Sequence, residues 1–372
     1  MFNTCHIETI KVIQEWLNDI SYSTLNGRMM QFLGQTGDLY LDFNKFMGII
    51  DRINPLYAFI FSVFRLGQPT ERSFLDSFIP TTVIDALFET GLLENKNQYY
   101  QMPEVGFLPL GGMYFVTGLP ETYPTVSRDS RFKPVDQSIQ LVMDEMVSQS
   151  VGTDFLEVSS DYGILANMAA SKGFKNIQIL SKHPDCVPLI QLNLALNNYE
   201  GEAVITENFT KMYDLIVGIN LSIKEKTANR NFNISDEKDV IQLFPVLSQL
   251  KETGQAILLL ESLGTIGEIW INQRLQKTDG FHIQSVVLDK IPYPSFLLLN
   301  YAQSPWEKQF ELMPQKYVDY IQKAIESSKC NAFVFIQLLK INKQKNEEPF
   351  VLFPFYNPKY SDPVFNYALL TV

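Results

Sequence analysis

Short apolar runs alternate with polar turns between residues 154 and 220, and this pattern organises the middle of the chain. Two segments between the runs have helical character. Residues 164–173 are rich in alanine and end at a glycine, and residues 187–196 carry apolar positions near the i, i+3, i+4, i+7 spacing. The apolar runs themselves lie at residues 155–158, 177–180, 203–205 and 214–217. We therefore predict a βαβαβ–β series of parallel strands, which binds ligands beyond the carboxyl ends of its strands.

Helical patterns fill most of the first 120 residues. Periodic apolar positions predict helices at residues 7–20, 39–53, 56–67, 70–75 and 80–93, with a hairpin following at residues 98–115. The helix at residues 56–67 is apolar nearly all round, so we expect it to be buried. The order helix, turn, helix, hairpin is typical of a winged helix, in which residues 80–93 would enter a DNA groove. That segment carries Asp85 and Glu89 without any Lys or Arg, which opposes phosphate contact, so a packing or substrate-covering domain is the alternative.

A polar, proline-containing connector at residues 121–135 is the predicted boundary between a first domain, residues 1–120, and a second, residues 136–372. In the second domain the apolar pattern predicts helices at residues 138–147, 240–250, 266–277 and 316–327, and strands at residues 254–261, 283–288 and 332–340. Residues 221–239 have the composition of a surface loop. The aromatic tail, residues 350–367, is predicted to pack on the core, and lining a substrate pocket is the alternative. Alternating strands and helices predict an α/β fold.

Glu157 lies near the end of the first apolar run, and Gly163 closes the polar turn that follows it. Residues 192–198, Leu-Asn-Leu-Ala-Leu-Asn-Asn, lie in the second helical segment. These features resemble the cofactor half of a class I S-adenosylmethionine (SAM)-dependent methyltransferase, of the group related to protein-glutamine and ribosomal-protein methyltransferases. The resemblance covers roughly residues 135–340. It implies a Rossmann-like seven-stranded domain that binds SAM, preceded by a winged-helix-like domain.

The resemblance implies a cofactor site formed by Glu157, Ser159, Asp161, Gly163, Ser181, Asn208 and Gly218. Ser159 and Asp161 stand where the family has its other two turn glycines. Asp161 thereby places a carboxylate where that of the cofactor would approach, an unfavourable pair. Ser181 stands where the family has an acid that holds the ribose hydroxyls, and it can form one such hydrogen bond instead of two. Asn208 stands in the place of the acid that contacts adenine.

Methyl transfer from a sulfonium mainly needs a nucleophile held in line with the methyl carbon, so positioning supplies most of the rate. The glutamine-modifying relatives carry Asn-Pro-Pro-aromatic after the fourth strand, where this chain has Ile-Asn-Leu-Ser. Asn220 of that sequence is the candidate catalytic residue, and a loop-capping role is its alternative. The predicted activity is methylation of an oxygen or nitrogen of a small metabolite or peptide. Two alternatives stay open: a catalytically inactive scaffold with this fold, and a winged-helix regulator whose second domain senses a ligand.

The net charge and the cysteine content limit the binding partners and the cellular compartment that we expect. A net charge of −11, without a run of Lys or Arg, gives no attraction to duplex nucleic acid. The three cysteines and three histidines are scattered, which fits reduced thiols in a cytoplasm and neither a zinc site nor another metal site. No apolar run reaches about 18 residues, so we expect no membrane span and no membrane partner. A homodimer through the N-terminal domain is a further hypothesis.

Overall fold

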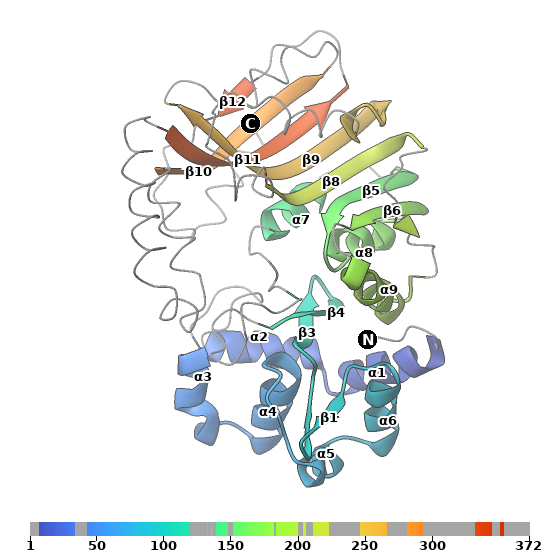
Figure 1. The fold of residues 1–372 in the computed structure, drawn as a ribbon, viewed down its shortest axis with the longest axis vertical. Coiled ribbons are helices and arrows are strands. Elements are labelled where there is room, and N and C mark those ends of the chain that lie inside the picture. The colour runs from blue at the N-terminus through green and yellow to red at the C-terminus, as the bar shows by residue number, and fades with distance from the viewer. Residues whose placement is uncertain are drawn as a thin grey trace. The chain divides into compact units, whose positions relative to one another are not determined.

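The structure is a computed structural model that describes residues 7–33, 43–119, 132, 135, 139–147, 152–181, 184–199, 204–205, 211–222, 246–265, 281–292, 332–343 and 350–352 (Figure 1). The chain forms two compact units, one of residues 1–140 with 160–206 and one of residues 141–159 with 207–372. The first unit thus groups the N-terminal residues with part of the predicted parallel series. The boundary predicted at residues 121–135 stays a prediction, because most of that connector lies outside the described residues.

Amphipathic helices make up the N-terminal part of the first unit. They are α1 (Ile7–Asp19), α2 (Tyr22–Phe32), α3 (Phe43–Ile49), α4 (Pro55–Ile60), α5 (Arg72–Phe78) and α6 (Thr81–Glu89), and a short turn, η1 (Ile50–Arg52), follows α3. The apolar stripe of α1 is buried as its periodicity predicts, at Ile10, Ile13, Trp16 and Leu17. This stripe packs against α6, and the Trp16 ring meets that of Phe64 edge-on with centroids 5.1 Å apart.

The segment predicted as a buried helix at residues 56–67 is helical, but it is fully buried only in its second half. Asn54 caps α4 by accepting a hydrogen bond from the Leu56 N–H at 2.9 Å, and a proline occupies the position after the cap. The first turn is exposed or half-buried, continuous burial begins at Ile60, and the helix goes on as the π-helix η2 (Phe61–Arg65). The prediction of uniform burial is wrong because the capped first turn starts at the surface of the unit.

Two hairpins replace the single one predicted at residues 98–115. β1 (Glu94–Lys96) pairs with β2 (Tyr99–Gln101), and β3 (Val105–Leu110) pairs with β4 (Met113–Gly118). Both turns have two residues with positive φ, which are Asn97 and Gln98 in the first and Gly111 and Gly112 in the second. Such turns match the right-handed twist of paired strands. The single-hairpin prediction is wrong because the first turn contains no glycine to mark it. The order α5, α6, hairpin agrees with the predicted pattern, and a winged-helix identity stays a prediction.

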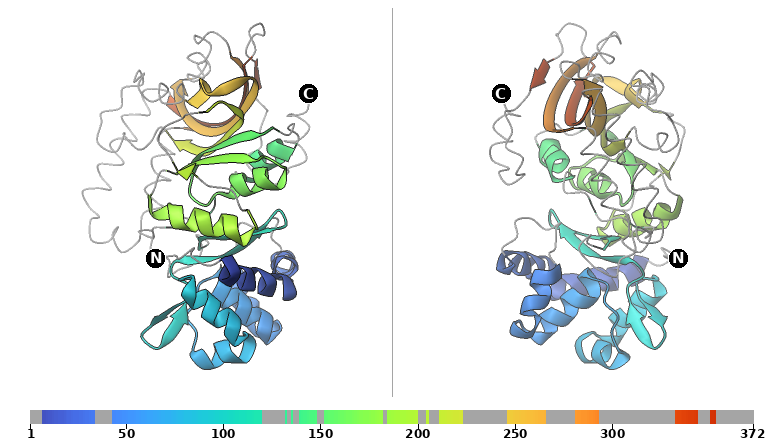
Figure 2. Two further views of the ribbon diagram at one scale, coloured as in Figure 1. Left: turned by 90° about the vertical axis from the view of Figure 1, so that its right-hand side faces the viewer. Right: turned by 60° about the vertical axis from the view of Figure 1, so that its left-hand side comes forward.

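The rest of the first unit consists of a parallel strand pair and two helices. β6 (Asn176–Ser181) runs parallel to β7 (Val204–Ile205), with Gln178 opposite Val204. The two predicted helices of this region are confirmed as α8 (Ile164–Ser171) and α9 (Val187–Leu196), and a short turn, η3 (Pro184–Cys186), leads into α9. α9 is buried along most of its length because it packs against α1, α8 and β4 (Figure 2).

The strands of the second unit follow the order β12-β10-β11-β9-β8-β5. β5 (Asp154–Ser160), β8 (Tyr213–Ser222) and β9 (Leu250–Thr265) run parallel, and β11 (Ala332–Asn342) and β10 (His282–Pro292) continue antiparallel. β12 (Phe350–Leu352) pairs with β10 in parallel, and helix α7 (Ile139–Val147) is tied to β11 by an ion pair between Glu145 and Lys340. Within the described residues β5, β8 and β9 form one parallel group and β6 and β7 another, so the fold is α/β, and a count of seven strands stays a prediction.

Most predicted elements of the second domain are confirmed where the structure describes them. The strands at residues 155–158, 214–217, 254–261, 283–288 and 332–340 are present and longer, and α7 matches the helix at residues 138–147. The predicted end of the helix at residues 240–250 is wrong, because Leu250 is the first residue of β9. Just before it, the Gln249 carbonyl accepts a hydrogen bond from the Tyr213 N–H at 2.8 Å. The predicted helices at residues 266–277 and 316–327, most of the loop and most of the tail lie outside the described residues.

None of the helices that the structure describes is both long enough and apolar enough to cross a membrane.

Candidate functional site

Predicted cofactor residues of the second unit lie on neighbouring parallel strands. Glu157 of β5 is opposite Val217 of β8, and Val158 is opposite Gly218. Glu157 is 2% exposed, so its carboxyl group lies inside the unit. Ser159 follows in β5, toward the carboxyl end of the strand. Because ligands bind beyond the carboxyl ends of parallel strands, the structure brings Glu157, Ser159 and Gly218 toward the end at which the sequence places the cofactor.

Asn220 lies within β8 rather than in a loop after it. The strand continues two residues beyond Asn220, so the prediction that it ends at residue 217 is wrong. The register against β9 shifts here, since Gly218 faces Leu258 while Leu221 faces Leu260. Two residues of β8 therefore oppose one residue of β9, and Asn220 is one of the two. Such bulges bend a strand and re-aim its side chains, and they are frequent next to active sites.

In the first unit, the turn at residues 160–163 connects β5 to α8. Gly163 has φ 67° and ψ 27°, a left-handed conformation that favours glycine. A Cβ at this position would lie 3.0 Å from Ile190 Cγ2, so there is little room for a side chain. Its N–H donates to Ser160 Oγ at 2.7 Å, and its carbonyl accepts from the side chain of Asn167 at 2.7 Å. The glycine matched from sequence is thus required by both the backbone and the packing.

Asp161 makes this turn electronegative. Its carboxylate is half-buried, and its charge acts on two neighbours in the same unit. Burial, with Asp161 and Asp185 adding to it, raises the pKa of the Cys186 thiol to about 12. Burial is also the main reason that the pKa of Tyr162 lies above its ordinary value, and Asp161 adds to that increase. Asp161 therefore contributes negative charge to this turn.

The remaining predicted positions are less informative. Ser181 is the last residue of β6 and is half-buried. Asn208 lies outside the described residues. No group of three or more His, Cys, Asp or Glu residues within the described ranges could hold a metal ion.

Two of the three asparagines of the matched segment, Asn193 and Asn197, contact the edge of β4. Asn193 Oδ1 accepts from the Val116 N–H at 2.7 Å, and its Nδ2 donates to the Val116 carbonyl at 3.0 Å. Asn197 makes the same two bonds with Tyr114, at 3.0 Å and 2.7 Å. Four helical residues advance about 6 Å and two strand residues about 6.7 Å, so the i, i+4 spacing matches alternate residues of the strand. We call these four residues the amide ladder.

Tyr162, which the sequence does not mark as a cofactor or catalytic residue, joins the turn to the same strand edge. Its side chain is 6% exposed, and its hydroxyl oxygen accepts a hydrogen bond from the Gly118 N–H at 3.2 Å. Its backbone carbonyl accepts from Asn193 Nδ2 at 3.0 Å. The available signal is the i, i+4 spacing of Asn193 and Asn197 in and just after a mostly apolar helix, because buried amides need partners. That signal gives no identity for the partner.

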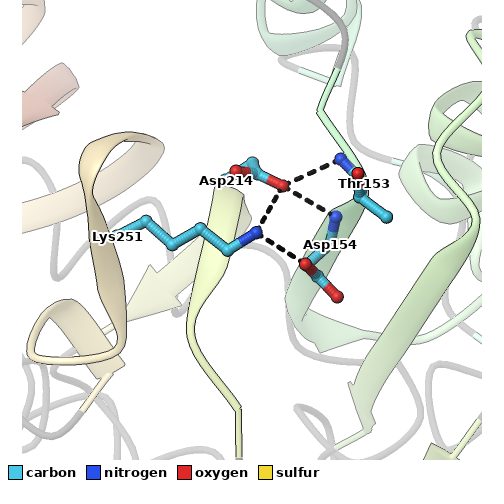
Figure 3. Close-up of polar contacts among 4 residues, drawn as sticks. All are labelled: Thr153, Asp154, Asp214 and Lys251. Carbon is cyan, nitrogen blue, oxygen red and sulfur yellow. Dashed lines mark hydrogen bonds and ion pairs between the residues drawn. The ribbon is translucent and has the colours of Figure 1, made fainter.

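A charged cluster ties the opposite, amino ends of β5 and β8 together (Figure 3). Lys251 Nζ donates to the carboxylates of Asp154 at 2.6 Å and of Asp214 at 2.8 Å. Asp214 Oδ2 also accepts from the N–H groups of Thr153 and Asp154, at 2.8 Å and 2.9 Å. Since Asp214 accepts three donors on one oxygen at the end away from the predicted ligand, we assign this cluster a structural role.

No known protein family matches the sequence. No curated protein matches it either. Solved structures with partial similarity include an O-methyltransferase from a trans-AT PKS multienzyme of Brevibacillus brevis in complex with S-adenosyl-L-homocysteine (SAH), which is 16% identical over 55% of this chain and 72% of its own, with a TM-score of 0.34. A SAM-dependent methyltransferase from Streptococcus mutans is 14% identical over 72% of this chain and 66% of its own, with a TM-score of 0.37.

A ribosomal protein methylase from Lactobacillus delbrueckii subsp. bulgaricus is 20% identical over 41% of this chain and 69% of its own, with a TM-score of 0.29. Scores of this size indicate a chain path that is shared only in part. The fold of this protein therefore rests on its own strand order, and its function has to be argued from its own residues.

Proposed function

We propose that this protein binds SAM and transfers the methyl group to an oxygen or nitrogen of a small metabolite or peptide. The observation that carries the proposal is the turn at residues 160–163, which leads from a parallel strand into α8 through Gly163 at φ 67°. Ile190 lies close to where a Cβ would be, so the glycine keeps this turn tight beyond the carboxyl end of β5, the end at which parallel strands bind ligands. The sequence resemblance of Glu157, Gly163 and residues 192–198 to class I methyltransferases supports the same function.

The side chains of the predicted site residues suit specific parts of SAM and of the methyl acceptor. SAM supplies an electrophilic methyl group on a positively charged sulfonium, and the buried carboxyl group of Glu157 provides negative charge to attract such a cation. Ser181 provides one hydrogen bond for the ribose, and Ser159, Asn208 and Gly218 complete the proposed cofactor set. Asn220, in the bulge of β8, orients the methyl acceptor by position rather than by acid–base chemistry.

Calorimetric titration with SAM and with SAH tests the proposal. We expect dissociation constants in the micromolar range for the whole protein, and the absence of binding by either compound at millimolar concentration would overturn it. Glu157→Gln should weaken SAM binding by about 3- to 10-fold and SAH binding by less, because only SAM carries the sulfonium charge. Glu252→Gln is the matched control, since the side chain of Glu252 is 80% exposed on the same unit.

The direction in which Asp161→Asn changes SAH affinity shows which part of the cofactor lies at the turn. If the carboxylate of the cofactor approaches the turn at residues 160–163, the charge of Asp161 opposes binding, and Asp161→Asn should tighten SAH binding by about 3- to 10-fold. Raising the salt concentration should reduce the difference between the two proteins. Weaker binding by the variant would show instead that Asp161 holds the cationic amino group of the cofactor.

A scaffold that binds without catalysis is the second candidate, and the electronegative turn at Asp161 favours it. Such a protein would bind SAH or another ligand without turning over SAM. Incubation with methyl-labelled SAM and fractionated small molecules and peptides from the native host distinguishes the two. Transfer of label to any fraction by the wild-type protein, and slower transfer by Glu157→Gln at a SAM concentration below saturation, supports the enzyme. Binding without transfer to any fraction supports the scaffold.

A further inference from the structure

Side chains, rather than another strand, accept the hydrogen bonds of one edge of β4. The donors are the N–H groups of Tyr114, Val116 and Gly118, and the acceptors are Asn197 at 3.0 Å, Asn193 at 2.7 Å and Tyr162 at 3.2 Å, in the same order. Alternate residues of a strand present these groups on one side, so the three contacts form a single line. Asn193 belongs to α9, Asn197 is the residue that follows the end of this helix, and Tyr162 belongs to the turn at residues 160–163.

Tyr162 is held at its side-chain hydroxyl and at its backbone carbonyl. Its hydroxyl accepts from the Gly118 N–H, and its carbonyl accepts from Asn193 Nδ2 at 3.0 Å. Asn193 in turn pairs with Val116 of the same strand. The next residue of the turn, Gly163, is fixed by its own hydrogen bonds to Ser160 and Asn167. Two paths therefore lead from β4 to the turn, one through the Tyr162 side chain and one through the Asn193 amide to the Tyr162 carbonyl.

We propose that Tyr162 is a positioning residue that fixes the turn at residues 160–163 against β4, so that the N-terminal hairpin sets the affinity of the turn for its ligand. The proposal rests on the function proposed above, in which this turn contacts SAM. Tyr162 acts through geometry: its hydroxyl is occupied by Gly118, and its side chain is 6% exposed. A buried N–H that loses its acceptor shifts a local equilibrium by about 5- to 30-fold, which is large enough to detect as a change in opening or in binding.

Asn197 provides the matched control. It makes the same pair of bonds with β4 as Asn193 does, and its third bond goes to the Asn193 carbonyl instead of to the turn. Asn197→Ala thus weakens the amide ladder without removing a bond to Tyr162. Tyr162→Phe removes the hydroxyl acceptor and keeps the ring, so it is the variant least prone to misfold.

Hydrogen–deuterium exchange of the whole, ligand-free protein tests whether Tyr162 holds the turn against β4. Tyr162→Phe should speed exchange at residues 160–163 by about 5- to 30-fold, because the turn opens more often. Asn197→Ala should speed exchange around Tyr114 and leave the turn unchanged. A purely structural role would lower protection in both variants alike, and that result, or an unchanged turn in Tyr162→Phe, overturns the proposal.

SAH titration then tests the effect on affinity. We expect Tyr162→Phe to weaken SAH binding by about 5- to 30-fold and Asn197→Ala by less than about twofold. By thermodynamic reciprocity, SAH should also slow exchange of the Gly118 N–H in the wild-type protein and less so in Tyr162→Phe. Equal affinities in all three proteins overturn the proposed link. If the wild-type protein binds no SAH, the proposed function fails, and exchange alone decides whether Tyr162 holds the turn.

Discussion

The side-chain amide of Asn193 makes with Val116 the two hydrogen bonds that a peptide group of a neighbouring strand would make. Its Oδ1 accepts from the Val116 N–H at 2.7 Å, and its Nδ2 donates to the Val116 carbonyl at 3.0 Å. Both residues are fully buried, so neither peptide group can turn to water instead. A helix can therefore cover the edge of a two-stranded hairpin without supplying a strand.

Removing the Asn193 amide should be strongly destabilising. Asn193→Ala leaves the N–H and carbonyl of Val116 and the carbonyl of Tyr162 without that partner, and we expect a loss of about 3 kcal/mol in the free energy of unfolding. Asn197 is only half-buried, so Asn197→Ala should lose about 1–2 kcal/mol. Urea denaturation measures both values. The near-isosteric Asn193→Asp keeps the acceptor and removes the donors, so wild-type stability in that variant would show that packing, and not hydrogen bonding, is responsible.

Gly163→Ala should destabilise the first unit more than Gly112→Ala. Both glycines have positive φ, 67° and 78°, which costs an alanine about 1–2 kcal/mol. A Cβ at Gly112 meets nothing within 4 Å, whereas one at Gly163 lies 3.0 Å from Ile190 Cγ2. We expect the difference between the variants, measured by urea denaturation, to be about 1 kcal/mol. Combining Gly163→Ala with Ile190→Ala should give less than the sum of the single losses, and strict additivity would argue against this contact.

Stability at both extremes of pH should depend on Lys251. Burial raises the pKa of Asp214, but hydrogen bonds from Lys251 and from the Asp154 and Thr153 N–H groups outweigh it, so the pKa lies below its ordinary value. Hydrogen bonds to Asp154 and Asp214 raise the pKa of Lys251. Asp214 thus adds stability above its unfolded pKa of about 3.9, lost as pH falls toward the folded value. Lys251 adds stability below about 10.4, lost as pH rises toward its folded value.

Lys251→Met should therefore flatten both limbs of the stability–pH curve, and at neutral pH it should lose about 1–2 kcal/mol. Urea denaturation between pH 3 and pH 11 gives the curve. Arg72→Met is the control, because its pair with Asp76 is exposed along α5, with side chains 39% and 49% accessible. We expect that variant to lose less than about 0.5 kcal/mol. If the unfolding free energy of Lys251→Met falls toward low and high pH as steeply as that of the wild type, the Lys251 cluster is not the cause of the pH dependence.

Gly27→Ala should stabilise the protein. Gly27 lies in the interior of α2, and a Cβ there meets nothing within 4 Å, so alanine should add about 0.5–1 kcal/mol through its higher helix propensity. Gly106→Ala should do the opposite, because its Cβ would lie 2.7 Å from the Arg65 carbonyl oxygen, a backbone atom. The melting temperatures of the two variants should move in opposite directions. A decrease for both would show that α2 does not have the open surface described here.

The local pattern of apolar and polar residues is enough to predict most helices and strands of the fold. The apolar runs around Glu157 and Val217 are short and bounded by polar turns, so their pairing as parallel strands follows from the helices between them. The end of β8 could not be read in the same way, because the bulge at Asn220 continues the strand through residues that look like a loop. The first hairpin turn was missed because Asn97 and Gln98 adopt positive φ without a glycine.

The site was predictable in its residue types but not in its contacts. Gly163 was identified from sequence, and its conformation explains why a glycine is needed there. Asn193 and Asn197 were also singled out, but as part of a cofactor motif. Their partners in β4 lie 77 and 83 residues earlier in the chain. No local sequence pattern encodes contacts between residues so far apart in the chain. Tyr162 is buried against the same strand, so its burial could not be predicted either.

The separation of 77 residues between Val116 and Asn193 has a consequence during synthesis. At about 5–20 residues per second, the ribosome delivers Asn193 about 4–15 s after Val116. Until then β4 has an open edge, which is a template for pairing with other chains. The nascent protein is thus most vulnerable to aggregation in this interval, and a fragment cut after the hairpin would remain in that state permanently.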